Sequence, residues 1–173
     1  LNLNFKLIRI SRHPVDNIYS YLKRGVGNIV KNNKYKNYLY STYAPKEKSI
    51  CIPWYLNINP KKYLNLGSAG RSVFSFIHNI KKIKRIKSNN KLLIINFDDL
   101  CKNPLAEISK ICSFLNVKSQ PKLSQFIRRA NFPRKIDLEK RKNKYKFLVK
   151  KIEDKKIIRS LDREIKFFEM KRK

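Results

Sequence analysis

The chain has 173 residues, enough for one domain with a sizeable core and short for two. Hydrophobic residues make up 42%, with only 4 Gly and 7 Pro, which excludes a linker or a disordered tail. Lys and Arg number 42 against 12 Asp and Glu, a net charge of +30. Such a charge attracts nucleic acid, an anionic membrane surface or an anionic cofactor or substrate. Because the charge is spread along the chain, we interpret most of it as solvated surface.

The first strand and helix are predicted around an arginine. Residues 5–11 (FKLIRIS) predict a short buried strand that ends at Arg12. Pro14 suits the first turn of a helix, where its missing N–H removes no bond. Gly25 and Gly27 predict the end of that helix. Its apolar residues recur at helical spacing: Val15, Ile18, Tyr19 and Leu22.

The stretch from 28 to 66 is the least regular part of the sequence. It is rich in Asn, Lys and Tyr and is interrupted by prolines, so we expect loops and short helices there. Trp54 and the neighbouring tyrosines are expected to be partial core, with a ligand pocket as the alternative. A second helix then presents one apolar face, made of Val73, Phe76, Ile77, Ile80 and Ile83.

The second half contains another strand and more helices. Residues 92–97 (LLIINF) are a continuous apolar run, typical of a buried parallel strand. Asn103 is the predicted cap and Pro104 the first residue of a third helix, whose apolar face is Ile108, Ile111, Cys112 and Leu115. Helical patterns return at 119–130 and from 137 to the end, there with Leu148, Ile152, Leu161, Ile165 and Phe168. Strands alternating with helices predict an α/β protein with a parallel sheet.

Metal and disulfide chemistry are not expected. The three cysteines are Cys51, Cys101 and Cys112; no CxxC pair occurs, and neither His13 nor His78 lies near a cysteine. We therefore predict no structural zinc site, no disulfide framework and a reducing compartment. No apolar run approaches the roughly 20 residues of a membrane span.

The first chemical motif runs from Arg12 to Tyr21 (RHPVDNIYSY). Arg12 stands at the carboxyl end of a predicted strand, where open α/β sheets bind ligands. The helix that begins two residues later offers N–H groups at its N-terminus, and Ser20 lies about 9 Å along its axis from Pro14. A guanidinium fork and a hydroxyl suit a phosphate. A surface ion pair for Arg12 and an ordinary helical position for Ser20 are the alternatives.

The second motif covers residues 97–104 (FDDLCKNP). Phe97 ends the second predicted strand, two carboxylates follow, and a capped helix begins. An aromatic ring at a strand end is suited to stacking on a base. Taken alone, the motif also fits a core phenylalanine followed by two acids that flank a helix.

Together and in this order, the two motifs resemble the sulfotransferases that use 3′-phosphoadenosine-5′-phosphosulfate (PAPS). The family's Arg-x-Pro-x-x-x-x-x-Ser-Tyr signature matches Arg12, Pro14, Ser20 and Tyr21. The family's Tyr-Glu-Asp-Leu-or-Met segment, Asn-or-Asp-Pro and helix ending in Phe-Leu-Gly are similar to residues 97–104 and the later Phe114-Leu115-Asn116. The resemblance implies that Arg12 and Ser20 hold the 3′-phosphate. It also implies that Phe97 contacts the adenine, by stacking but without the hydroxyl of the family's tyrosine.

The resemblance also implies a fold. We expect a P-loop NTPase-like sulfotransferase fold with a truncated parallel sheet flanked by helices and a helical C-terminal part. A single partial domain would cover residues 1–173. Within it we expect a strand and 3′-phosphate helix over 1–27, irregular loops over 28–69, helix-strand-helix over 70–117, and helices over 118–173.

Parts of the family pattern have no counterpart in the sequence. The family's Gly-containing loop with its lysine and the catalytic His or Glu lie upstream of the arginine motif, so the chain is expected to be a piece of a longer protein and inactive alone. No Arg-Lys-Gly triplet follows. The candidates Arg128-Arg129 and Arg134-Lys135 are interpreted as solvated charges. We assign His13 no catalytic role.

The function that the resemblance implies is sulfuryl transfer from PAPS to a hydroxyl or amine, without a metal. The acceptor is a saccharide, lipid, small alcohol or protein, and the sequence leaves both this choice and the oligomeric state open. The alternative is a basic nucleic-acid-binding protein, although no specific nucleic acid is expected as a partner. A P-loop kinase would need a Gly-rich loop with lysine, which the sequence lacks. A cytoplasmic enzyme is expected, with a Golgi enzyme separated from its membrane anchor as the alternative.

Overall fold

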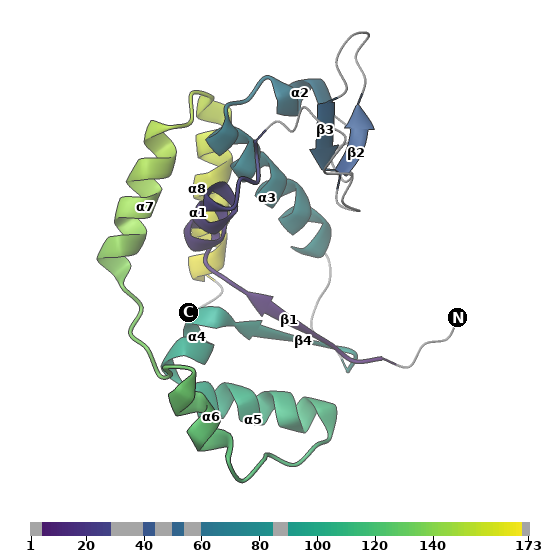
Figure 1. The fold of residues 1–173 in the computed structure, drawn as a ribbon, viewed down its shortest axis with the longest axis vertical. Helices are drawn as coiled ribbons and strands as arrows, with labels where there is room; N and C mark the ends of the chain where they lie inside the picture. The colour runs from purple at the N-terminus through teal and green to yellow at the C-terminus, as the bar shows by residue number, and fades with distance from the viewer. Residues whose placement is uncertain (1–4, 29–39, 44–49, 54–59, 85–89, 171–173) are drawn as a thin grey trace. The chain divides into compact units, whose positions relative to one another are not determined.

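The chain forms two compact units in the computed structural model, which describes residues 5–28, 40–43, 50–53, 60–84 and 90–170 (Figure 1). The first unit comprises Leu1–His13 and Arg85–Lys140. The second comprises Pro14–Lys84 and Arg141–Lys173. A short parallel sheet with eight helices in the described residues confirms the α/β class predicted from the sequence. The predicted boundaries near residues 27, 69 and 117 stay predictions.

The first unit contains the parallel strand pair. Strand β1 (Leu7–Ser11) pairs with β4 (Leu92–Asn96) in the register Leu7 to Leu92 through Ser11 to Asn96. Both predicted strands are thus confirmed in position, although β4 ends one residue earlier than expected. The predicted burial of β1 is wrong, because Leu7 is 51% and Ile10 56% exposed. Helices α4 (Phe97–Lys102), α5 (Pro104–Leu115) and α6 (Leu123–Arg129) follow β4 in the chain.

Helix α4 corrects the prediction for Phe97. The sequence suggested that Phe97 ends the strand, but it is the first residue of a helix. The side chain of Asn96 accepts a hydrogen bond from the backbone N–H of Asp98 at 2.9 Å, which satisfies an N–H group that the helix itself leaves without a partner. Asn103, the predicted cap of α5, makes no side-chain cap bond, whereas Pro104 begins that helix as expected.

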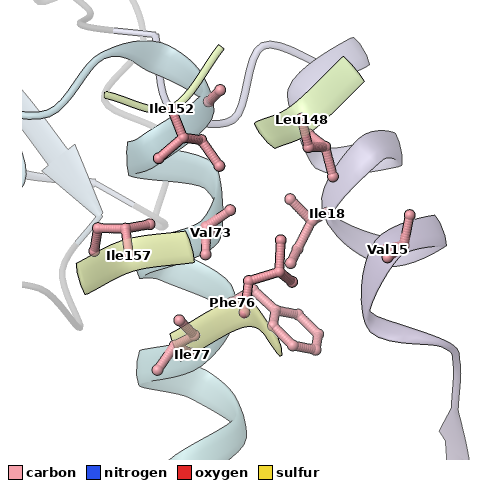
Figure 2. Packing of buried hydrophobic residues seen from close by; sticks show 10 residues of the cluster. Val15, Ile18, Val73, Phe76, Ile77, Leu148, Ile152 and Ile157 are labelled. Carbon is pink, nitrogen blue, oxygen red and sulfur yellow. The ribbon is translucent and has the colours of Figure 1, made fainter. Parts of the chain in front are cut away.

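The second unit is built around the helices α1 (Pro14–Lys23), α3 (Ser68–Lys84) and α8 (Lys155–Met170). A short helix α2 (Pro60–Leu64) precedes α3, and α7 (Leu138–Lys150) continues from the first unit into the second. Figure 2 shows Ile18 of α1 beside Val73 and Phe76 of α3, with Leu148 close by. All core residues except Ala69 and Ile157 belong to the apolar faces predicted from the sequence. The core consists of Val15, Ile18, Ala69, Val73, Phe76, Ile77, Leu148, Ile152, Ile157 and Leu161.

The irregular stretch contains strands that the sequence did not predict. Strands β2 (Tyr40–Tyr43) and β3 (Ile50–Pro53) form an antiparallel pair, so the expectation of loops and short helices alone was wrong. Alternation of apolar and polar residues is absent from these four-residue segments, so no period-2 signal marks them. Trp54 lies outside the described residues, and Tyr63 of α2 is buried, as expected for partial core.

Asp16 joins α1 to α7 inside the second unit. Its carboxylate accepts a hydrogen bond from Arg141 Nε at 2.8 Å and one from Lys144 Nζ at 2.5 Å. The side chains of Asp16 and Arg141 are only 9% and 10% exposed. Burial raises the pKa of Asp16, but the hydrogen bonds and charges of Lys144 and Arg141 outweigh it and hold the pKa below the ordinary value. The network therefore fixes the first turn of α1 against α7.

The turn after α1 is tied to the start of α3. Arg71 donates hydrogen bonds to the backbone carbonyls of Gly27 and Leu66, and Ser72 Oγ donates to the carbonyl of Val26. Gly27 has a φ of +101°, as expected for a glycine that ends a helix. These bonds hold the C-terminal end of α1 in place.

Within the ranges described by the structure, no helix is long and apolar enough to cross a membrane.

Candidate functional site

The carboxyl ends of β1 and β4 bring the two sequence motifs together. Ser11 pairs with Asn96 as the last residues of the two strands, so Arg12 and Phe97 emerge side by side at one end of the parallel pair. The guanidinium carbon of Arg12 lies 5.1 Å from the centre of the Phe97 ring. This distance is within the range of a cation–π contact. The structure thus joins two residues that are far apart in the sequence.

One N–H donor of the Arg12 guanidinium has no hydrogen-bond partner in the described part of the chain. This donor is the Nε atom, which is buried. A buried N–H without a partner costs on the order of 1–3 kcal/mol, which an accepting ligand atom recovers. The site therefore has a positively charged group whose geometry suits an anion, next to an aromatic ring.

The neighbouring residues are mostly buried. His13 is 3% exposed and Asp98 is 1% exposed. The absence of a catalytic role for His13 stays a prediction. Asp98 belongs to the first turn of α4, where a carboxylate is favoured by the helix dipole.

Ser20 belongs to the second unit, in the second half of α1, where it is half-buried. The structure brings Arg12 and Phe97 into one site but does not bring Ser20 into their unit. The Asp16 network and the turn at Gly27 hold α1 from both of its ends, so the hydroxyl of Ser20 sits on a fixed helix. Its predicted role at a phosphate stays a prediction.

A basic segment that the sequence analysis treated as solvated lies beside α4. The backbone N–H of Arg134 donates to the carbonyl of Cys101 at 2.9 Å, and its guanidinium lies 4.1 Å from the Phe132 ring centre. Cys101 is four residues after Phe97 on α4, about 6 Å along the helix axis. Arg134 is therefore anchored to the helix that begins at the candidate site. Spacing alone did not reveal this because the anchor is a long-range backbone bond.

Two further predictions concern the other basic pair and metal binding. Arg128 and Arg129, at the end of α6, are exposed, as expected for solvated charges. No group of three or more His, Cys, Asp or Glu side chains that could hold a metal ion occurs in the described ranges.

Comparison with known proteins identifies the family. The model of the sulfotransferase domain family matches residues 1–172, almost the entire chain. No curated protein and no solved structure matches the chain. Since a family model that covers the sequence from 1 to 172 includes both motifs and the strand pair that joins them, the chain belongs to the sulfotransferase domain family.

Proposed function

We propose that the protein transfers a sulfuryl group from PAPS to a hydroxyl or amine acceptor. In this proposal Arg12 and Ser20 bind the 3′-phosphate of the nucleotide and Phe97 contacts the adenine. Membership of the sulfotransferase family supports the transfer reaction. The identity of the donor and the roles of the three residues rest on the resemblance of the motifs and on the geometry around Arg12.

The observation that carries the proposal is the buried Nε of Arg12 without a hydrogen-bond partner. A phosphate oxygen that accepts from this N–H would remove the cost of burying it. The contact with Phe97 orients the guanidinium, so less side-chain freedom is lost when the phosphate binds.

The helix that follows Arg12 in the chain has an N-terminus that is itself suited to an anion. Pro14 occupies its first position, and the N–H groups of its first turn carry the positive end of the helix dipole. A 3′-phosphate held by Arg12 would be two residues from this N-terminus along the chain. Arg134, whose backbone N–H is bound to Cys101 of α4, and the next residue, Lys135, are further candidates for contact with the nucleotide.

The chemistry that these residues contribute is binding and orientation. Sulfuryl transfer resembles phosphoryl transfer in having charge spread over the equatorial oxygens, so positioning and electrostatic stabilisation supply the catalysis. Arg12, Ser20 and Phe97 would hold the nucleotide end of the donor and so fix the direction of the sulfuryl group. We assign activation of the acceptor to no residue of this chain, and we propose a cytoplasmic location because the cysteine pattern fits a reducing compartment.

The proposal predicts the effect of Arg12→Ala on nucleotide binding. We expect adenosine 3′,5′-bisphosphate to raise the melting temperature of the wild-type chain more than adenosine 5′-monophosphate does, because only the bisphosphate has the 3′-phosphate. Arg12→Ala should abolish this difference and weaken binding of the bisphosphate by about ten- to a hundredfold, the contribution of a charged hydrogen bond. Thermal shift measurements at several ligand concentrations give the apparent affinities.

A matched control separates the site from general charge. Arg128→Ala removes an exposed arginine from the same unit and changes the net charge by the same amount. It should leave the preference for the bisphosphate intact. If Arg12→Ala and Arg128→Ala weaken binding equally, or if the wild type shows no preference for the bisphosphate, the proposed 3′-phosphate site is wrong.

A further inference from the structure

The C-terminal end of α7 and the neighbouring part of α1 share a surface that the proposed nucleotide site does not use. We call it the lysine–aromatic face; it consists of Tyr19 and Lys23 of α1, Phe147 and Lys150 of α7, and Lys151, which directly follows α7. On a helix with about 100° between successive residues, Lys150 lies about 60° to one side of Phe147 and Lys151 about 40° to the other. Phe147 is thus flanked by lysines.

The two aromatic rings of this face hold the ammonium groups around them. Tyr19 and Phe147 make an edge-to-face contact with ring centres 5.6 Å apart. The ammonium of Lys23 lies 5.7 Å from the centre of the Tyr19 ring, and that of Lys151 lies 5.1 Å from the centre of the Phe147 ring. These are cation–π distances, so two lysines are oriented by the rings.

The charge of this face is uncompensated. Lys23, Lys150 and Lys151 are exposed, and none of them forms an ion pair with a carboxylate in the described part of the chain. Nearby, the Asp16 carboxylate is already bound by Arg141 and Lys144. The face is therefore available to an anionic partner.

The exposed ring indicates which kind of anion fits. Phe147 is 39% exposed, while the adjacent Leu148 is fully buried in the core. A polyanion that is bound through its charge alone would gain little from an apolar ring among lysines. A bilayer interface accommodates both groups, since aromatic rings enter the headgroup layer while lysines contact anionic lipids.

From this combination we propose that the lysine–aromatic face attaches the protein peripherally to an anionic lipid surface. The lysines contact the phosphate and carboxylate groups of the lipids, and Phe147 enters the boundary between headgroups and acyl chains. The attachment is separate from nucleotide binding and holds whether or not the proposed function is correct.

Vesicle binding tests the charge of the face. The wild-type chain should cosediment with phosphatidylcholine vesicles that contain phosphatidylserine and not with pure phosphatidylcholine vesicles. Replacing Lys23, Lys150 and Lys151 together by glutamine should weaken this binding on the order of a hundredfold, because each lysine near an anionic surface contributes several-fold. Far-UV circular dichroism checks that the triple variant keeps its helices.

A second triple variant controls for net charge. Lys102, Lys118 and Lys122 are exposed lysines of the first unit, and their replacement by glutamine removes the same three charges. This variant should bind the anionic vesicles within about threefold of the wild type, the residual effect of the long-range field. Equal losses in the two triple variants would mean that overall charge attracts the lipid, and the proposed face would be wrong.

Phe147 distinguishes a membrane from other polyanions. Phe147→Ala leaves the charge unchanged and should weaken vesicle binding several-fold. In a Phe147→Trp variant, the fluorescence of the new tryptophan should shift to shorter wavelength when anionic vesicles are present. Short single-stranded DNA should cause no such shift. The proposal is overturned if Phe147→Ala binds like the wild type, or if DNA binds more tightly than the vesicles at the same salt and loses affinity in the first triple variant.

Discussion

Gly27→Ala is expected to lower the free energy of unfolding by about 3 kcal/mol, the sum of backbone strain and steric overlap. The φ of +101° at Gly27 is a conformation that side-chain-bearing residues rarely adopt. A Cβ atom there would lie 2.4 Å from the carbonyl oxygen of Ser68 and 2.7 Å from Ser72 Oγ. Because Ser68 O is backbone at the start of α3, the overlap cannot be relieved by a side-chain rotation.

Gly67→Ala is the matched control for this substitution. A Cβ atom on Gly67 would meet no atom within 4 Å, and the residue lies immediately before α3. The free energy of unfolding should therefore change by no more than about 0.5 kcal/mol. Urea denaturation of both variants measures the difference. A Gly27→Ala protein as stable as Gly67→Ala would show that the turn after α1 is not held against α3 as described.

Asp16→Asn is expected to destabilise the protein by about 3 kcal/mol at neutral pH, since it removes the carboxylate that pairs with the buried guanidinium of Arg141. Lys144 is 21% exposed and turns more easily to solvent, so Arg141 accounts for most of the loss. Glu153→Gln removes an exposed carboxylate between α7 and α8 and should change stability by less than about 0.5 kcal/mol. Urea denaturation compares the two variants.

The stabilising effect of Asp16 should depend on pH. Because folding lowers the pKa of Asp16 from its ordinary value of 3.8, the contribution is fully present above that value and is lost as the pH falls through the lower pKa of the folded state. Protonated aspartate resembles asparagine in shape, so the stability difference between wild type and Asp16→Asn should shrink toward acid pH. A difference that is the same at pH 7 and at about pH 2 would contradict the charged network.

The periodic parts of the sequence predicted most of the fold. Val15 and Ile18, as well as Val73, Phe76 and Ile77, recur at helical spacing, and all five are buried in the core of the second unit. The apolar run at 92–97 correctly predicted a parallel strand, which pairs with β1 and has Leu92 and Ile95 buried. These predictions are correct because local spacing determines which face of a helix or strand is apolar.

One failure is local and the others depend on distant parts of the chain. The sequence predicted a strand that ends at Phe97 because Phe97 closely follows four aliphatic residues, but Asn96 stands between them and accepts the capping hydrogen bond from Asp98 N–H with which a helix begins. The Arg134 anchor and the Asp16 network join residues far apart in sequence, and no pattern within either segment marks the partner. The β2–β3 pair was likewise missed, because these strands are recognised by their pairing and their sequences lack an alternation of apolar and polar residues.

The candidate site likewise combines features that the sequence predicted with features that depend on packing. The sequence motifs predicted Arg12 and Phe97 at the carboxyl ends of two strands, and the register of β1 with β4 explains why they meet. The buried Nε of Arg12 could not be predicted, because burial depends on the packing around it. Ser20 was predicted from its spacing on a helix, and its place on α1 confirms the helix but leaves its role as a proposal.

The most direct test of the account is a calorimetric titration of the wild-type chain with adenosine 3′,5′-bisphosphate and, separately, with adenosine 5′-monophosphate at the same moderate salt. We expect the bisphosphate to bind at least about tenfold more tightly, because its 3′-phosphate accepts a charged hydrogen bond from the unused Nε of Arg12. Equal affinities for the two nucleotides would contradict a 3′-phosphate site at Arg12 and, with it, the proposed binding of PAPS.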